Sequence, residues 1–194
     1  MRHKFSAMSL ISFSYLTGKL FCIINNIRTN KVKMKKLKIY LDTTIINCLD
    51  QKEKLNRMEE THKLWNKIKN GEFEAVISDI DIAEINNCNK EKQNTLYKYL
   101  SQINYTLVES DEKSIDIATK MIDLNILKQK NILDCQHIAN AIISGCDAIV
   151  SWNFRHIVNH KTMMGVKAIT ALKGYADLLI YAPPVLIEGE DDDT

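Results

Sequence analysis

Proline, glycine and long apolar runs are all scarce in this sequence. Of its 194 residues only 2 are Pro and 6 are Gly, whereas 45% are hydrophobic and 26% are charged. This composition excludes a disordered or collagen-like chain and is typical of a globular protein with one domain and some tail. No run reaches the roughly 18 apolar residues that a membrane-spanning helix needs, so no membrane association is expected.

The cysteines follow no pattern that binds a metal or builds a disulfide framework. There are 5, an odd number, and no two of them have C-x-x-C spacing. A zinc knuckle and a dense set of disulfides are therefore not expected. Free thiols, buried or half-buried, are the simpler interpretation, and they favour the reducing cytoplasm as the location.

Neither sign of charge dominates the whole chain, but its two ends are strongly biased. Lys and Arg number 26 against 24 Asp and Glu, a formal net charge of +2. Residues 1–38 contain nine basic residues and no acid, and residues 188–194 contain five acids and no base. The segment between them has 17 basic and 19 acidic residues, so a large, uniformly basic surface for nucleic acid is not supported.

These biases suggest three parts. Residues 1–33 are predicted to be a poorly ordered extension, or to lie upstream of the true start, because Met34 opens a basic stretch directly before the first strong strand. Residues 34–187 form the folded domain, which no repeat and no linker rich in Gly, Pro or Ser divides. Residues 188–194 are an acidic, solvated tail.

Short apolar runs alternate along the folded domain with longer stretches of helical periodicity. Strands are predicted over 37–41, 74–78, 105–108, 148–151 and 177–181. Helices are predicted over 57–70, 79–85, 90–103, 111–127, 134–144 and 160–173, with another beginning after Asp42 and with Asp79 as an N-cap. The alternation indicates a three-layer α/β fold with a mainly parallel sheet. In such sheets functional residues gather at the carboxyl ends of the strands, near the reversal of strand order.

Four polar residues fall where predicted strands end or the following helices begin: Asp42, Glu84, Asp134 and Asn153. Separations of 42, 50 and 19 residues mean that only a fold that joins strand ends can bring them together. Three carboxylates in one cleft raise one another's pKa unless a cation neutralises them. A hard divalent ion, Mg²⁺ or Mn²⁺, suits ligands that are all oxygen, and it can orient water and offset charge on a phosphate. Asp81, about one helical turn before Glu84, is the rival for its place.

Four segments resemble, in order and spacing, the motifs of the PIN-domain family. They are Ile39–Asn47, Val76–Ile85, Leu133–Ala141 and Asp147–Phe154, and the resemblance spans residues 37 to 187. It implies an α/β/α sandwich with a five-stranded parallel sheet. It also implies Mg²⁺- or Mn²⁺-dependent cleavage of RNA by activated water, often by the toxin of a bacterial toxin–antitoxin pair. The family's catalytic, metal-binding acids fall on Asp42, Glu84 and Asp134.

The chain departs from the family's pattern at Asn153, where many members carry a fourth acid. It is most similar to a subgroup with a Ser-Trp-Asn-Phe-x-His signature, here residues 151–156. An amide can ligate, or accept a hydrogen bond from water, but it adds no charge. Three carboxylates balance one divalent ion but not two, so we expect one firmly held metal and weakened catalysis. Asn153 is expected to position water or substrate.

Other polar residues are predicted to have supporting roles. Thr44 and Ser151 are placed to hydrogen-bond the ligands or their water. His137, three residues after Asp134, is interpreted as a packed, hydrogen-bonded histidine, and Trp152 as a packing residue. Arg155 is a candidate substrate contact, together with lysines that border the cleft in sequence and that otherwise form a solvated rim: Lys128, Lys130, Lys161 and Lys167.

The leading hypothesis is a metal-dependent endoribonuclease that acts as a toxin, forms a homodimer and is restrained by a small antitoxin. The alternative is a non-catalytic PIN-fold module that binds RNA or protein, because the fourth acid is missing. A 5′-nuclease-like enzyme that cleaves DNA shares the metal-site chemistry but usually needs more carboxylates.

Overall fold

A computed structural model of the chain describes residues 35–187; the predicted extension 1–33 and the acidic tail 188–194 lie outside the described residues. The elements are β1 (Lys38–Leu41), α2 (Thr43–Cys48), η1 (Lys52–Lys54), α3 (Leu55–Lys69), β2 (Glu74–Ser78), α4 (Asp79–Asn86), α5 (Lys90–Leu100), β3 (Tyr105–Val108), α6 (Glu112–Asp123), η2 (Gln129–Asn131), α7 (Ile132–Ile143), β4 (Ala148–Val150), α8 (His160–Lys173), β5 (Leu179–Tyr181) and α9 (Pro184–Ile187), where η marks a 3₁₀ turn. No helix in this part of the chain is long and apolar enough to cross a membrane.

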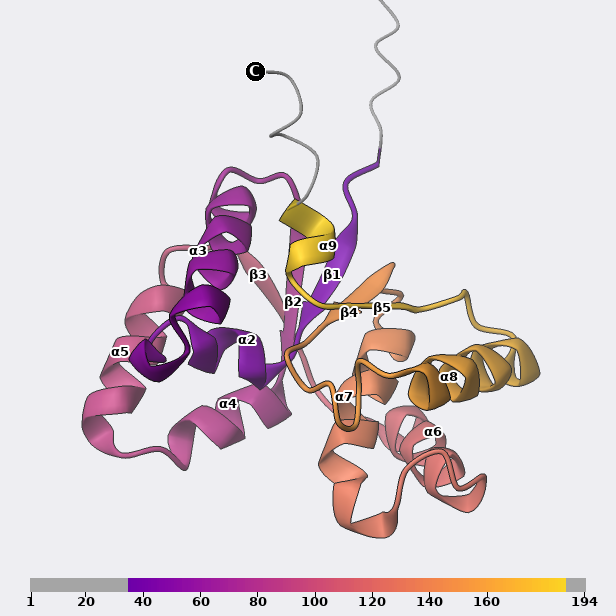
Figure 1. The fold of residues 1–194 in the computed structure, drawn as a ribbon. Coiled ribbons are helices and arrows are strands. Elements are labelled where there is room, and N and C mark those ends of the chain that lie inside the picture. The colour runs from indigo at the N-terminus through magenta and orange to yellow at the C-terminus, as the bar shows by residue number, and fades with distance from the viewer. Residues whose placement is uncertain (1–34, 188–194) are drawn as a thin grey trace, which may run out of the picture. The chain divides into compact units, whose positions relative to one another are not determined.

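The five strands form one sheet in the order β3-β2-β1-β4-β5, and every neighbouring pair is parallel. In the middle, Ile39 of β1 lies between Ala75 of β2 and Ala148 of β4. The chain moves outward from β1 through β2 to β3, and then returns to the other side of β1 for β4 and β5 (Figure 1). The strand order therefore reverses beside β1, which makes the carboxyl ends of β1 and β4 the expected place for a site.

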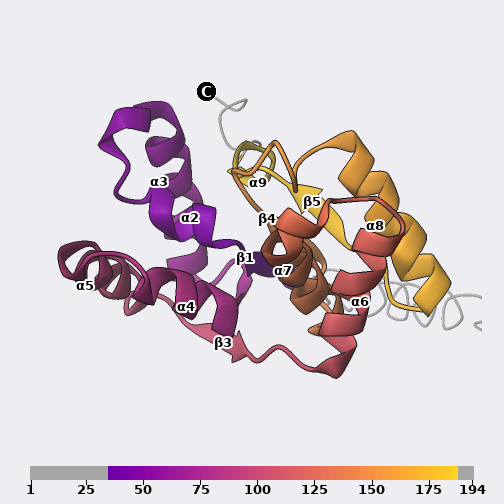
Figure 2. The ribbon, with the colours of Figure 1, turned by 90° about the horizontal axis from the view of Figure 1, so that it is seen from below.

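Helices cover both faces of the sheet, so the predicted three-layer α/β/α sandwich with a five-stranded sheet is confirmed, and the sheet is wholly parallel (Figures 1 and 2). Helices α2, α3 and α5 pack on one face, and α6, α7 and α8 on the other. The first face carries Ile39, Leu41, Ile77 and Val150, and the second carries Tyr40, Val76, Ile149 and Ile180. Strands buried on both faces explain the near-continuous apolar runs in the sequence.

Most predicted helix ends differ from the structure by one to four residues, and two differences at helix ends have a clear local cause. Ser78, not Asp79, is the N-cap of α4, because its hydroxyl and the carboxylate of Asp81 form a capping box. The helix predicted to reach residue 127 ends at Asp123, since Asn125 adopts a left-handed backbone (φ 58°) that asparagine tolerates at helix ends. The chain then leaves α6 as a loop that leads to η2 and α7.

That loop packs tightly on α8 through a glycine. A Cβ atom on Gly165 of α8 would lie only 2.6 Å from two side-chain carbons of Ile126. Ile126 is itself buried in the core beneath α6, α7 and α8. Gly165 therefore sets how closely the loop after α6 can approach α8.

We predict that Gly165→Ala lowers the free energy of unfolding by about 1–3 kcal/mol, because the added methyl group overpacks this contact. In an open helix the same change stabilises by about 1 kcal/mol, so the sign of the effect tests the contact. Urea denaturation of Gly165→Ala, Ile126→Ala and the double variant measures it. The destabilisation by Gly165→Ala should shrink when Ile126 is already Ala; equal destabilisation in both backgrounds would contradict the predicted clash.

Candidate functional site

The four polar residues predicted from the sequence lie around the carboxyl edge of the sheet. Asp42 directly follows β1 and is the N-cap of α2, with only 3% of its surface exposed. Glu84 lies on α4, the helix that follows β2, and Asp134 is the third residue of α7. Asn153 lies in the loop after β4. Hydrogen bonds and ion pairs connect them into one cluster: Asn153 N donates to Ser151 Oγ over 2.9 Å, and Ser151 in turn donates to Asp42.

Asp42 is held in place by hydroxyl groups from two neighbouring strand ends. Thr44 Oγ1 donates to Asp42 Oδ2 over 2.7 Å, and Ser151, the residue after β4, donates to the same oxygen. The other oxygen, Oδ1, receives only a long bond of 3.4 Å from the Thr44 amide. Thr44 and Ser151 therefore both donate to Asp42, and Oδ1 is the oxygen of Asp42 that has capacity for a further partner.

Asp134 is oriented by the loop that follows β4. Asn153 Nδ2 donates to Asp134 Oδ1 over 2.8 Å, and His156 Nδ1 lies 2.9 Å from Asp134 Oδ2. Asn153 Oδ1 in turn accepts from the His156 amide over 3.0 Å. Burial raises the pKa of Asp134 against the opposing effect of His156, and the Asp42 carboxylate raises it further.

Glu84 joins Asp42 through a buried histidine on α7. His137 Nε2 lies 3.6 Å from Glu84 Oε2 and 3.9 Å from Asp42 Oδ1. Its side chain is almost fully buried, whereas 36% of the Glu84 side chain is exposed. The nearby His137 side chain lowers the pKa of Glu84, which favours the ionised form of this half-buried carboxylate.

Asp81, the rival of Glu84 in the sequence, has a fully buried carboxylate with every oxygen already in use. Four donors reach it: Tyr40 Oη over 2.8 Å, Ser78 N over 2.8 Å, Ser78 Oγ over 3.0 Å and Thr43 Oγ1 over 2.7 Å. Asp81 belongs with Asp42 and His137 to a group whose candidate ligand atoms all lie within 4.8 Å of one another. Three of its four bonds reach Oδ2 and cap α4, which fits a structural carboxylate, whereas Oδ1 accepts only the bond from Thr43.

The surroundings of His137 favour its doubly protonated form. The Tyr40 hydroxyl donates to Asp81, so it accepts from His137 Nδ1 over 2.8 Å, and His137 Nε2 faces only carboxylate oxygens. Burial alone lowers the pKa of His137, but the carboxylates of Asp81, Glu84 and Asp42 outweigh it and raise the pKa to about 9. The cation of His137 thus offsets the buried anion of Asp81.

The remaining predictions at the site have mixed outcomes. Trp152 packs in the core: its Nε1 donates to Thr61 Oγ1 over 2.8 Å, and the Arg57 guanidinium lies over its ring at 5.2 Å. Arg155 is exposed and lines a separate pocket that adjoins Asp134 through His156.

The sequence reasoning missed the pairing of His156 with Asp134, because this pairing depends on how the loop after β4 folds. For His137 the sequence did contain a signal, because it follows Asp134 by three residues and so lies on much the same side of α7.

The residues present fit a hard divalent cation. Asp42, Glu84 and Asp134 offer oxygen atoms from three different elements, and Asp42 Oδ1 and the half-exposed Glu84 carboxylate have unused acceptor capacity. Asp81 and His137 offset each other, so this trio, which we call the acidic trio, keeps the negative charge that a divalent ion would balance.

No protein-family model matches the chain, and no curated protein matches it. Among solved structures, the chain is similar to one in the crystal structure of VapBC2 from Rickettsia felis bound to a DNA fragment from their promoter, with a TM-score of 0.50. The two share 15% sequence identity over 75% of this chain and 98% of that chain. At this identity the likeness concerns the fold alone, and with the motifs and sheet order above it shows that the chain has a PIN-like α/β/α fold.

Proposed function

We propose that the protein is a metal-dependent endoribonuclease that hydrolyses phosphodiester bonds in RNA. The observation that supports the proposal is that Asp42, Glu84 and Asp134 lie on segments around the reversal of strand order, with His137 within 3.9 Å of both Asp42 and Glu84. Behind the trio, the His137 cation and the Asp81 anion offset each other. The only cationic or potentially cationic side chains that contact the acidic trio among the described residues are His137 and His156, so the negative charge of the trio is not fully offset.

The acidic trio would hold Mg²⁺ or Mn²⁺, and when bound the ion supplies a Lewis acid that offsets negative charge on the scissile phosphate. The protein's own part is to orient the carboxylates. Thr44 and Ser151 fix Asp42, and His137 keeps Glu84 ionised and directed towards Asp42. Such neighbours of ligands are known to matter nearly as much as the ligands themselves.

Asn153 takes a positioning role in this proposal. Its amide nitrogen holds Asp134, while its oxygen accepts from the His156 backbone and so fixes the loop after β4. Arg155, on the same loop, is exposed and is proposed to contact the substrate. Water attacks the phosphodiester in line with the departing oxygen, and the three ligands plus Asn153 form the proposed catalytic set.

The proposal extends to the setting in which the nuclease acts. The VapBC2 structure contains a complex bound to promoter DNA, and this chain shares the fold of one of its chains. On that basis we propose that this protein is a toxin whose activity a small antitoxin restrains, that it forms a homodimer and that it acts in the cytoplasm.

The first test is cleavage of labelled single-stranded RNA with Mn²⁺ or Mg²⁺. Asp42→Asn and Asp134→Asn should each reduce the rate at least about 100-fold, the upper range for removal of a ligand's supporting partner. Asp123→Asn, a charge-matched change at an exposed residue of α6, should leave it unchanged. Equal cleavage by Asp42→Asn and wild type would reveal a contaminant. A wild type that binds RNA but never cleaves it would favour the non-catalytic module.

A second test separates the roles of Asp81 and Glu84. Asp81→Asn should cost about 3–5 kcal/mol of unfolding free energy without metal, because it removes one partner of a buried ion pair. Glu84→Gln should cost about 1 kcal/mol or less but abolish most of the rise in melting temperature on adding Mn²⁺. Urea denaturation and thermal melting with and without Mn²⁺ give both readouts. The reverse pattern would make Asp81 the ligand.

Asn153→Asp tests whether the missing fourth acid limits metal binding. Without metal the new carboxylate faces Asp134 at hydrogen-bond distance, so the melting temperature should fall. With Mn²⁺ it should recover and rise more steeply than in wild type, and RNA cleavage should increase. Asn89→Asp, at the exposed N-cap of α5, is the matched control and should change neither value. If the variant behaves like this control, Asn153 lies outside the metal site.

A further inference from the structure

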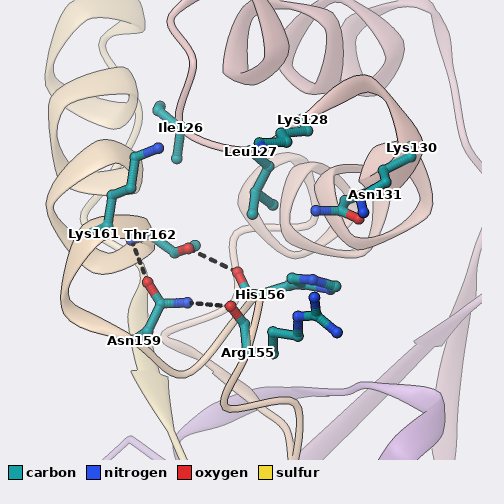
Figure 3. A pocket seen from close by; sticks show the side chains of 10 residues that line it. All are labelled: Ile126, Leu127, Lys128, Lys130, Asn131, Arg155, His156, Asn159, Lys161 and Thr162. Carbon is teal, nitrogen blue, oxygen red and sulfur yellow. Dashed lines mark hydrogen bonds between the residues drawn. The ribbon is translucent and has the colours of Figure 1, made fainter.

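A basic pocket lies beside Asp134 of the acidic trio, with His156 between them. It has a volume of about 230 Å³ and opens between the loop before α7 and the loop that joins β4 to α8 (Figure 3). Its lining includes Lys128, Lys130, Arg155, His156 and Lys161, and no acidic residue is among the residues that line it. We call it the basic pocket.

The cations of the basic pocket come from both of its walls. Lys128 and Lys130 lie on the wall that includes η2, and Arg155 and Lys161 lie on the opposite wall (Figure 3). Within residues 35–187, Lys128, Lys130 and Arg155 form no ion pair. Unpaired cations that face one hollow repel each other, and an anion between them would relieve that repulsion.

Hydrogen bonds fix the shape of the pocket, and one of its cations, Lys161, takes part in them. Asn159 caps α8 by accepting from the Thr162 amide over 3.0 Å, and its Nδ2 donates to the Arg155 carbonyl over 3.2 Å (Figure 3). Thr162 Oγ1, on a buried residue, donates to the His156 carbonyl over 2.7 Å. Lys161 reaches the loop after α6, where its ammonium donates to the Asn125 carbonyl over 2.6 Å. The two walls are therefore held together before any ligand arrives.

The basic pocket and the acidic trio share a boundary. His156 lines the pocket, and its Nδ1 lies 2.9 Å from Asp134 Oδ2. Asn131 of the pocket precedes Asp134 by three residues, and Arg155 follows Asn153 by two. A phosphodiester placed at the trio would thus have the pocket within reach of the neighbouring part of the same strand.

We infer that the basic pocket binds an internal backbone phosphate next to the phosphodiester that is cut, an assignment that rests on the proposed ribonuclease for its choice of RNA as ligand. The acidic trio repels a polyanion, and a cationic subsite beside it offsets that repulsion and fixes the strand's register. Contacts to phosphate position a strand without reading its bases, so the pocket sets where the strand lies but not which sequence is cut.

The test is binding of fluorescently labelled single-stranded RNA, measured by anisotropy in EDTA so that no cleavage occurs. Lys128→Ala/Lys130→Ala and Arg155→Ala should raise the dissociation constant by about ten-fold. They should also flatten the slope of log affinity against log salt concentration by about 0.7 for each phosphate that the variant no longer neutralises. The charge-matched controls Lys63→Ala/Lys98→Ala and Lys98→Ala change exposed residues of α3 and α5, which cover the other face of the sheet. They should alter binding less than about two-fold. Equal weakening in pocket variants and controls would overturn the inference.

A second arm locates the phosphate along the strand. Replacing single phosphates by neutral methylphosphonates should reveal one internal position at which wild-type binding weakens several-fold and Lys128→Ala/Lys130→Ala binding does not weaken further. If only removal of the 5′-terminal phosphate shows this pattern, the internal assignment is wrong. Because binding is measured without metal, a wild type that binds RNA through the pocket but cleaves nothing would refute the proposed nuclease and leave this subsite standing.

Discussion

The candidate site depends on one buried cation. His137 has carboxylates near both of its ring nitrogens, with Asp81 on one side and Asp42 and Glu84 on the other. Burying a charged imidazole is costly unless it is paired and hydrogen-bonded, and here Tyr40 completes the arrangement by bridging Nδ1 to Asp81. Without this cation, Asp81 would be an unpaired buried anion directly behind the acidic trio. The network therefore allows acidic residues to crowd at one strand end without destabilising it.

The fold explains why these residues can meet. Tyr40 is an inner residue of the central strand and points to the face that α7 covers, which brings its hydroxyl to His137. Its neighbour two residues on, Asp42, has left the strand and caps α2. Because strand order reverses beside β1, the end of β4 supplies Ser151 to the same carboxylate. A single parallel sheet thus gathers donors and acceptors from segments that lie far apart in the sequence.

Much of this arrangement was predictable because it follows local patterns. Strands β2 and β3 have the predicted bounds, and Asp42 was identified because it ends an apolar run. The structural role of Asp81 was not predictable, since its capping box requires Ser78 rather than Asp79 to be the N-cap of α4. The bonds of Tyr40 and His156 were also beyond reach, because they depend on which face a strand presents and on how a loop folds. Periodicity specifies neither.

The acidic trio is supported differently on its two sides, and this asymmetry has a functional consequence. Asp42 and Glu84 both lie next to the buried His137 side chain, although 36% of the Glu84 side chain is itself exposed. Asp134 instead rests on Asn153 and on His156, a partly exposed side chain that also lines the basic pocket. A strand in that pocket would therefore contact the same His156 side chain that orients Asp134, so binding in the pocket and the position of one proposed ligand would be coupled through a single residue.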